Sequence, residues 1–265
     1  MRAVAAVRLR PRSASILLFA SVSGLAAFLW PLLVQPGAVL ESTSAPLVFA
    51  LLLPVLLAVV LAEVSEGGID TKAIAMLGVL SAIGAALRPL GAGTAGVETV
   101  FFLLVLAARV FGPGFGFVLG ATTLFASALL TGGVGPWLPF QMLGAAWFGL
   151  GAGLLPRASG RIEIVLLASY SAVAALLYGA LLNLSFWPFA LGEHTQLSFD
   201  ASRSVLENLH AFALFSLSTS LGWDIGRALT TAVLVVITGP AVLTALRRAA
   251  RRAAFAAPVE FEPAR

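Results

Sequence analysis

Few side chains in this 265-residue sequence could carry out chemistry, and most of them are acids, arginines and amides near the ends of apolar runs. Glu98, His194 and Asp224 could act as acid or base on a lipid or peptide, which would make the chain a membrane enzyme. His194 and His210, the only histidines, lie in one polar segment. They could contact a metal or ligand, although two solvated loop residues are the more ordinary interpretation. The absence of cysteine excludes disulfides, cysteine-bound metals and thiol nucleophiles.

Motifs for energy conversion and hydrolysis are missing from the sequence. It has no G-x-x-x-x-G-K-[ST] loop to cradle phosphates, no H-E-x-x-H zinc motif and no G-x-S-x-G nucleophile elbow. No apolar run carries a charge at its centre, where proton-coupled pumps place ionisable residues. We therefore expect a protein without an ATPase site, metal or cofactor of its own. Any transport by it would be passive or driven by a partner.

A glycine-rich stretch at residues 90–96, which includes Thr94, is a candidate ligand site. Glycine disfavours a continuous helix there, and irregular backbone at membrane depth is tolerated only where protein buries it or where it lines a cavity. Arg88 and Glu98 flank the stretch and could pair with each other or bind a polar ligand group. Asp224 and Arg227 are three residues apart on one predicted helix face, so an ion pair between them is expected.

Four large side chains, Trp137, Gln141, Trp187 and Trp223, are expected at the same level of the membrane. Tryptophans at such positions are typical of an aromatic belt at the lipid interface. Beside a glycine-rich loop they also suit a pocket that stacks on a flat ligand and hydrogen-bonds its rim. Asn183 precedes Trp187 by one helical turn and can share its face. Both interpretations stay open at this point.

Transmembrane helices must position these residues. Sixty per cent of the residues are apolar and 11% are charged, against about 25% charged in a soluble domain. A membrane span needs about 20 apolar residues, so we expect one membrane domain with short loops. A shorter apolar segment at 211–221 is predicted to be an outer helix or a partly inserted lid. Eight spans are predicted, at residues 15–34, 46–62, 73–87, 97–111, 115–130, 137–155, 162–189 and 226–246.

The charge distribution predicts the orientation of these spans. Eight spans place both termini on one side of the membrane. If that side is the cytoplasm, only Arg88, Arg203 and Arg227 of the 16 Lys and Arg residues lie outside, as the positive-inside rule favours. The net charge of +4 then needs no nucleic acid to explain it. The basic start could belong to a signal peptide, but the apolar run is long and no clear cleavage site follows, so a retained helix is preferred.

Small residues recur at helical spacing on the third predicted span, at Ala75, Gly78, Ala82 and Ala86. Such rows let another helix approach closely in lipid. The row could pack against a helix of the same chain or form a docking face for a separate membrane subunit.

Three segments carry a family resemblance: TKAIAMLGVLSAIGAALRPLGAGTAG, RVFGPGFGFVLGATTLFASALLTGGVGPWLPFQMLGAAWFGLGAGLLP, and WDIGRA before the last span. From Thr71 to Arg252 the chain resembles the substrate-binding (S) component of energy-coupling factor (ECF) transporters, the bacterial vitamin importers. The resemblance implies an all-α integral membrane protein with a six-helix S-component-like core at 71–252. An extension at 1–70 with two extra transmembrane helices precedes it, and a cytoplasmic tail at 253–265 follows.

The same resemblance implies a transmembrane coupling subunit, two cytoplasmic ATPase subunits and a vitamin as partners in the bacterial cytoplasmic membrane, which would explain the missing motor. The coupling subunit would meet Gly78, Ala82 and Ala86, although Gly78 and Val79 depart from the family's strict alanine pattern. The G-P-W-L-P-F-Q run is similar to a subgroup associated with cobalamin uptake, while riboflavin, thiamine, biotin or a queuosine precursor stay open. A membrane enzyme and a ligand-free membrane scaffold are the alternatives from other classes.

The expected site therefore has two parts. The expected ligand contacts are Arg88, Thr94, Glu98, Trp137, Gln141, Asn183, Trp187, Trp223, Asp224 and Arg227, and the expected coupling-subunit face is Ala75, Gly78, Ala82 and Ala86.

Overall fold

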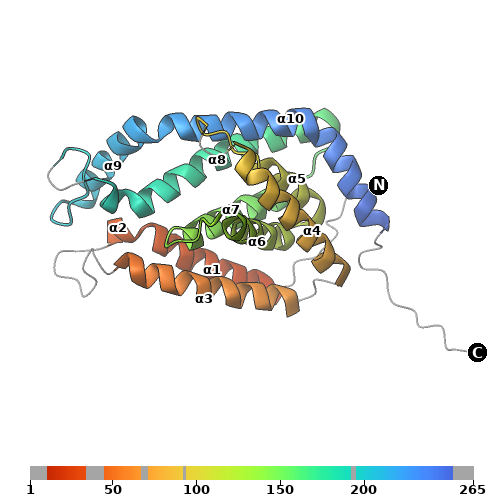
Figure 1. Cartoon of the computed structure of the whole chain (residues 1–265), viewed down its shortest axis with the longest axis horizontal. Helices are drawn as coiled ribbons and strands as arrows, with labels where there is room; N and C mark the ends of the chain where they lie inside the picture. The colour runs from red at the N-terminus through yellow and green to blue at the C-terminus, as the bar shows by residue number, and fades with distance from the viewer. Residues whose placement is uncertain (1–10, 34–44, 67–70, 92–93, 192–194, 253–265) are drawn as a thin grey trace, which may run out of the picture.

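The computed structural model describes residues 11–33, 45–66, 71–91, 94–191 and 195–252, and every regular element in these ranges is a helix (Figure 1). The predicted all-α membrane class is therefore confirmed. The helices are α1 (Pro11–Phe28), α2 (Trp30–Leu33), α3 (Ala45–Glu66), α4 (Thr71–Leu87), the 3-10 turn η1 (Arg88–Gly91), α5 (Phe101–Phe111), α6 (Pro113–Thr131), α7 (Leu138–Leu154), α8 (Gly160–Ala190), α9 (Val205–Thr219) and α10 (Leu221–Arg252).

Five helices of the described chain are long and apolar enough to cross a membrane, namely α1, α4 together with η1, α6, α8 and α10. Three shorter apolar helices, α5, α7 and the Leu51–Ala62 part of α3, occupy the other predicted spans. Protein, more than lipid, surrounds α5, because nine of its eleven residues are buried. Each of the eight predicted spans thus coincides with a helix.

The outer segment differs from the prediction at two helix boundaries. Helix α9 begins at Val205, well before residue 211, because Ser204 and Glu207 form a capping box that satisfies the first backbone N–H groups. His210 therefore lies on a helix and not in a loop, while His194 lies outside the described residues. Helix α10 begins at Leu221 and not at 226, so Trp223 and Asp224 belong to its first turns.

The centre of the molecule is the contact between α6 and α7, where glycines let the two backbones touch. A Cβ on Gly120 would lie 2.1 Å from the carbonyl oxygen of Ala145, and a Cβ on Gly149 would lie 2.1 Å from that of Gly116. Such close contacts are typical of helix packing in lipid, where small residues allow good van der Waals contact. Figure 1 shows α6 and α7 enclosed between α8 and α10 on one side and α1 and α3 on the other.

The N-terminal helices pack into the same hydrophobic core as the rest of the chain. The indole Nε1 of Trp147 on α7 donates to Ser21 Oγ on α1 at 3.0 Å. Gly24 on α1 lies so close to Leu143 that a Cβ there would be 2.1 Å from the Leu143 Cδ2. Buried Trp30 on α2 donates to the Ser185 carbonyl of α8 at 3.1 Å. The α1–α3 segment therefore covers one side of the central helices; its role as a separate N-terminal domain stays a prediction.

A buried group of ionic side chains joins α5, α8 and α10 at the end of the molecule where the basic C-terminal part of α10 lies. Glu163 Oε1 accepts from Arg109 Nε at 2.8 Å and from Arg247 Nη2 at 2.6 Å. The side chains of Arg109 and Glu163 are 9% and 3% exposed. Arg109 also donates to the Leu155 carbonyl at 3.0 Å, next to the end of α7. One carboxylate thus holds two guanidinium groups from two helices.

Replacing Glu163 with alanine should strongly destabilise the protein, because it leaves the buried Arg109 without a counter-charge. Removing one partner of a buried ion pair costs about 3–5 kcal/mol. Denaturant unfolding of the detergent-purified protein measures the loss. Arg157→Ala removes an exposed charge near the same end and is the matched control, expected to change stability by less than about 0.5 kcal/mol. Equal stability of the two variants would contradict a stabilising role for the Glu163 group.

Candidate functional site

Arg227 on α10 is the centre of a second ionic group, at the opposite end of α5. Its Nε lies 2.8 Å from Glu98 Oε1, and its Nη1 lies 2.7 Å from Asp224 Oδ1. The Arg227 and Asp224 side chains are each 11% exposed, and that of Glu98 is 27% exposed. The expected Asp224–Arg227 ion pair is present. The possible Arg88–Glu98 ion pair is not found among the described residues, where Glu98 bonds to Arg227 and Arg88 bonds to Gln141.

Glycines bring the Glu98 loop against α10. The carbonyl oxygen of Trp223 lies 2.1 Å from where a Cβ of Gly96 would be, and that of Ala95 lies 2.0 Å from a Cβ position on Gly226. Gly96 has a φ of 78°, which glycine adopts without steric cost. Backbone therefore touches backbone between the loop and the first turns of α10. This contact places the Glu98 side chain within hydrogen-bond distance of Arg227.

The glycine-rich stretch is irregular from Thr94 onward, as expected, but residues 90–91 at its start are helical. The chain continues after α4 as the 3-10 turn η1 as far as Gly91, and residues 92–93 lie outside the described part. Thr94 closes the loop through two backbone hydrogen bonds: its N–H donates to the Gly91 carbonyl at 3.3 Å, and its own carbonyl accepts from Val97 N–H at 2.7 Å. Its side chain is exposed.

Helix α8 contributes two residues that sequence reasoning missed. The Arg227 Cζ lies 5.2 Å from the centre of the Tyr178 ring, a cation–π arrangement, and Tyr178 is 5% exposed. The adjacent Gly179 makes room for Asp224, whose Oδ1 lies 1.9 Å from the position of a Cβ on that glycine. The available signal was composition, since the chain has only two tyrosines and Tyr178 stands beside a glycine inside an apolar span.

Arg88 and Gln141 extend this group toward α4 and α7. Arg88 Nη2 donates to Gln141 Oε1 at 3.2 Å. Gln141 lies one helical turn before Gly144, which the Tyr178 ring contacts. The Tyr178 ring thus lies between Gly144 of α7 and the Arg227 guanidinium of α10. We call the connected residues the polar cluster: Arg88, Glu98, Gln141, Tyr178, Asp224 and Arg227.

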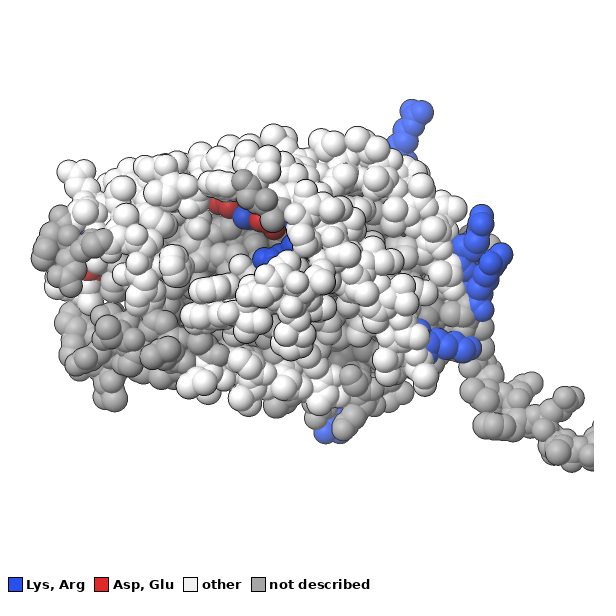
Figure 2. Space-filling view, in the orientation of Figure 1, with Lys and Arg blue, Asp and Glu red and all other residues white. Residues whose placement is uncertain are grey.

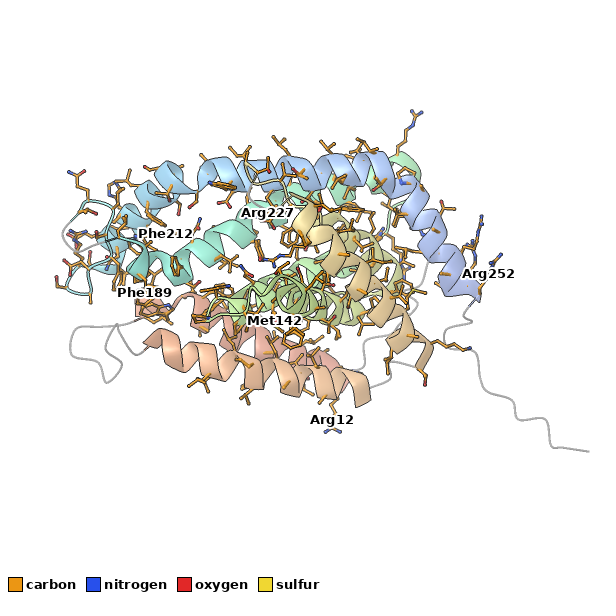
Figure 3. All side chains as sticks on the ribbon, viewed as in Figure 1. Arg12, Met142, Phe189, Phe212, Arg227 and Arg252 are labelled. Atoms are coloured by element: carbon orange, nitrogen blue, oxygen red, sulfur yellow. The ribbon has the colours of Figure 1, made fainter. Side chains whose placement is uncertain are left out.

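The polar cluster opens to one face of the molecule. Figure 2 shows a hollow in this face with acidic and basic side chains visible inside it, where α4, α8 and α10 come together in Figure 1. Figure 3 shows Arg227 directed from α10 toward the inside of the helix bundle at that position. Most Lys and Arg side chains visible on this face gather toward the end of the molecule where Figure 3 labels Arg252.

The other expected ligand contacts, three tryptophans and Asn183, differ in how deeply they are buried. Trp137 and Trp223 are 49% and 48% exposed, so a lipid belt and a ligand-stacking role both remain open for them. Trp187 is 1% exposed and uses its indole N–H on the Leu197 carbonyl at 2.6 Å, which holds the outer segment against α8. It is therefore an interior residue and not part of the expected outer belt. Asn183 Nδ2 is buried and has no hydrogen-bond partner among the described residues.

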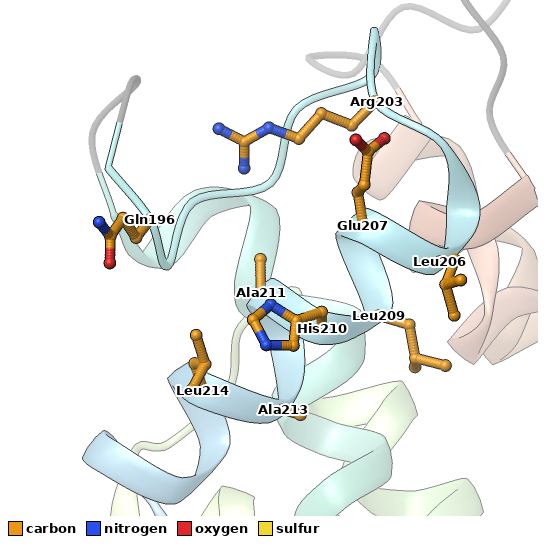
Figure 4. Close-up of a pocket in the computed structure, with 9 residues that line it drawn as sticks. All are labelled: Gln196, Arg203, Leu206, Glu207, Leu209, His210, Ala211, Ala213 and Leu214. Carbon is orange, nitrogen blue, oxygen red and sulfur yellow. The ribbon is translucent and has the colours of Figure 1, made fainter.

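The outer segment forms an open cavity of its own, of about 750 Å³, between α9 and the loop at residues 195–203 (Figure 4). His210, Arg203 and Glu207 line it together with Leu206 and other apolar side chains. The pKa of Glu207 is below its ordinary value, because the Ser204 hydroxyl and then the Ser204 backbone N–H donate to its carboxylate. No three His, Asp or Glu side chains of the described chain come together as a metal site.

The predicted row of small residues on α4 faces outward. Ala75, Gly78, Ala82 and Ala86 are all exposed, and a Cβ on Gly78 would meet nothing within 4 Å. The opposite face of α4 makes the contacts with α6. There Ser81 Oγ shares a 2.7 Å hydrogen bond with Thr122 Oγ1, and the Thr123 Cγ2 lies 2.6 Å from a Cβ position on Gly84. Packing within the described chain thus uses a different row of α4 from the predicted one.

These features define a multi-pass helical membrane protein with a polar cluster that opens to one face and an exposed row of small residues on α4. The family model for the ECF transporter, substrate-specific component, matches residues 72–248. The chain therefore belongs to the family of substrate-specific components of ECF transporters. The matched region includes the polar cluster and the row of small residues but leaves out α1–α3. No curated protein and no solved structure matches the chain.

Membership of the family has direct consequences. Its members are substrate-binding transport subunits and not enzymes. The family implies partnership with ECF transmembrane and ATPase subunits and with a small-molecule substrate.

Replacing Gly179 with alanine should disrupt the ionic group around Arg227. The added methyl would occupy the position of the Asp224 carboxylate and force it away from the guanidinium. Overpacking of this kind costs about 1–3 kcal/mol, measured as a loss of unfolding free energy in detergent. Gly222→Ala on α10 is the matched control, because a Cβ there meets nothing within 4 Å. The packing role of Gly179 would be refuted by equal losses in the two variants.

Proposed function

We propose that this chain is the vitamin-binding subunit of an ECF importer, which takes up its substrate at the polar cluster on the extracellular side. A membrane coupling subunit driven by two cytoplasmic ATPases would then release the vitamin into the cell. The observation that carries this proposal is the half-open polar cluster inside the region matched by the family. Cobalamin is the first candidate, since Gln141 of the cluster is the last residue of the G-P-W-L-P-F-Q run.

The distribution of basic side chains supports this orientation. Arg12, and Arg252 at the end of α10, lie away from the polar cluster in Figure 3. The positive-inside rule places such residues in the cytoplasm. The chain would then sit in the bacterial cytoplasmic membrane with both termini inside and the polar cluster facing outward.

The ionic contacts argue against the alternative of a membrane enzyme. A general acid or base must be free to reach a substrate proton. Glu98 and Asp224, two of the three candidate groups, are instead held at 2.8 and 2.7 Å by one arginine. The contacts of both carboxylates suit a structural and binding role better than proton transfer.

A thermal-shift screen of the detergent-purified chain tests the proposed function. Cobalamin, biotin, riboflavin, thiamine and a queuosine precursor are tested one at a time. A compound that binds only the folded state stabilises it by about 2.7 kcal/mol at 100 times its Kd. We expect one of these compounds to raise the melting temperature, with cobalamin the first candidate. No shift with any of them would refute vitamin binding by the chain alone.

The exposed row on α4 supplies a separate test of the coupling-subunit partner. Ala82→Leu should weaken co-purification with the coupling subunit and leave vitamin binding intact, because a leucine keeps a partner helix from close approach. An overpacking cost of about 1–3 kcal/mol corresponds to a loss of affinity of roughly 5- to 150-fold. Ala241→Leu makes the same change at an exposed position of α10 and is the control. Equal co-purification of both variants would remove α4 as the docking face.

A further inference from the structure

Arg88 differs from the other charged residues of the polar cluster in its partner. Both carboxylates of the cluster, Glu98 and Asp224, are within hydrogen-bond distance of Arg227. Arg88 donates instead to the neutral amide oxygen of Gln141, at 3.2 Å. In the part of the chain that the structure describes, no carboxylate therefore lies in direct contact with the Arg88 guanidinium.

The position of Arg88 leaves part of its charge available to an anion from outside the chain. Its side chain is partly buried directly after α4, where it meets Gln141 of α7. Partial burial takes away some of the water that would solvate the charge. A guanidinium has five N–H donors in a planar fork, and Gln141 accepts from only one of its nitrogens. The remaining donors match the two oxygens of a carboxylate or phosphate.

A second unused donor lies on the α8 face that meets the cluster. Asn183 Nδ2 is buried without an acceptor among the described residues. Asn183 follows Gly179 by one helical turn, and Gly179 contacts Asp224, so both residues belong to the side of α8 that faces the polar cluster. The acidic groups of the cluster are already engaged, whereas hydrogen-bond donors remain unused. A ligand that presents acceptors and negative charge suits such a site.

Resting on the proposed function, we infer that the substrate is an acidic vitamin whose carboxylate or phosphate binds the Arg88 guanidinium, with Gln141 holding the guanidinium in place. Among the candidates, biotin carries a carboxylate and cobalamin a phosphodiester, whereas riboflavin has no acidic group of this kind and thiamine is a cation. The structure therefore favours the first two. The phosphate of a lipid headgroup offers the same chemistry and is the alternative source of the anion.

The experiment measures binding to the delipidated, detergent-purified chain with biotin, biotin amide, cobalamin, riboflavin and thiamine as probes. Biotin or cobalamin should bind, and Arg88→Met should weaken that binding about 10- to 100-fold, as expected for hydrogen bonds to a charged group. Arg88→Lys should restore part of the affinity. If biotin is the ligand, its amide should bind weakly to the wild type and equally weakly to Arg88→Met.

Four outcomes would overturn the inference, and they separate it from the proposed function. Binding of riboflavin or thiamine but no acid would leave the vitamin-binding role standing and remove the acidic substrate. Unchanged affinity of Arg88→Met for the acid would also remove it. If phosphatidylglycerol stabilises the wild type but not Arg88→Met, while vitamin affinity is unchanged, the anion comes from lipid. Binding of no probe would overturn this inference, and the proposed function would fall with it if the queuosine precursor also gave no thermal shift.

A stability measurement without ligand guards against a folding artefact. Arg88→Met removes a partly buried charge that has no contacting carboxylate, so the apo variant should be as stable as the wild type or more stable. Arg227→Met is the contrasting variant, because it leaves Glu98 and Asp224 without their shared partner. A large loss of apo stability in Arg88→Met would show that Arg88 is structural and would contradict the inference.

Discussion

The arrangement of the helices around the polar cluster depends on burying one arginine. A charge among membrane helices is costly unless partners compensate it, and Arg227 is compensated by Glu98 and Asp224. This requirement brings the loop before α5 onto α10, which is possible because Gly96 and Gly226 carry no side chains. The need to compensate the Arg227 charge thus fixes how α5, α8 and α10 lie relative to one another. Because both carboxylates bond to Arg227, Arg88 has no carboxylate in contact among the described residues.

The opposite end of the bundle satisfies the same constraint with the charges reversed. There one acid, Glu163, holds Arg109 and Arg247 from two other helices. Glu98 lies just before α5 and Arg109 near its end, so ion pairs tie both ends of this short, buried helix to its neighbours. The group around Arg227 joins one guanidinium to two carboxylates, whereas the group around Glu163 joins one carboxylate to two guanidiniums.

Sequence patterns predicted the local features well and the long-range contacts poorly. Each of the eight apolar runs falls on a helix, and five of these helices are long and apolar enough to cross a membrane. The spacing of Asp224 and Arg227 predicted their ion pair. The partner of Glu98 lies 129 residues away and is reached only because a glycine loop docks on α10. Trp187 was expected at an outer surface, but the segment after α8 folds back over it. The spacing of residues within one helix cannot predict these two contacts, because they depend on where separate segments meet in the fold.

Helix α4 connects the two parts of the candidate site, the polar cluster and the exposed row of small residues. Its inner face packs on α6 through Ser81 and Gly84, which leaves Ala82 and the other small residues of the row exposed. The α1–α3 segment covers the other side of the central helices and does not hide that row. Arg88 follows α4 directly in η1, and the two form one continuous apolar helical segment, Thr71–Gly91. The residue that bonds to Gln141 of α7 thus belongs to the same helical segment as the exposed row.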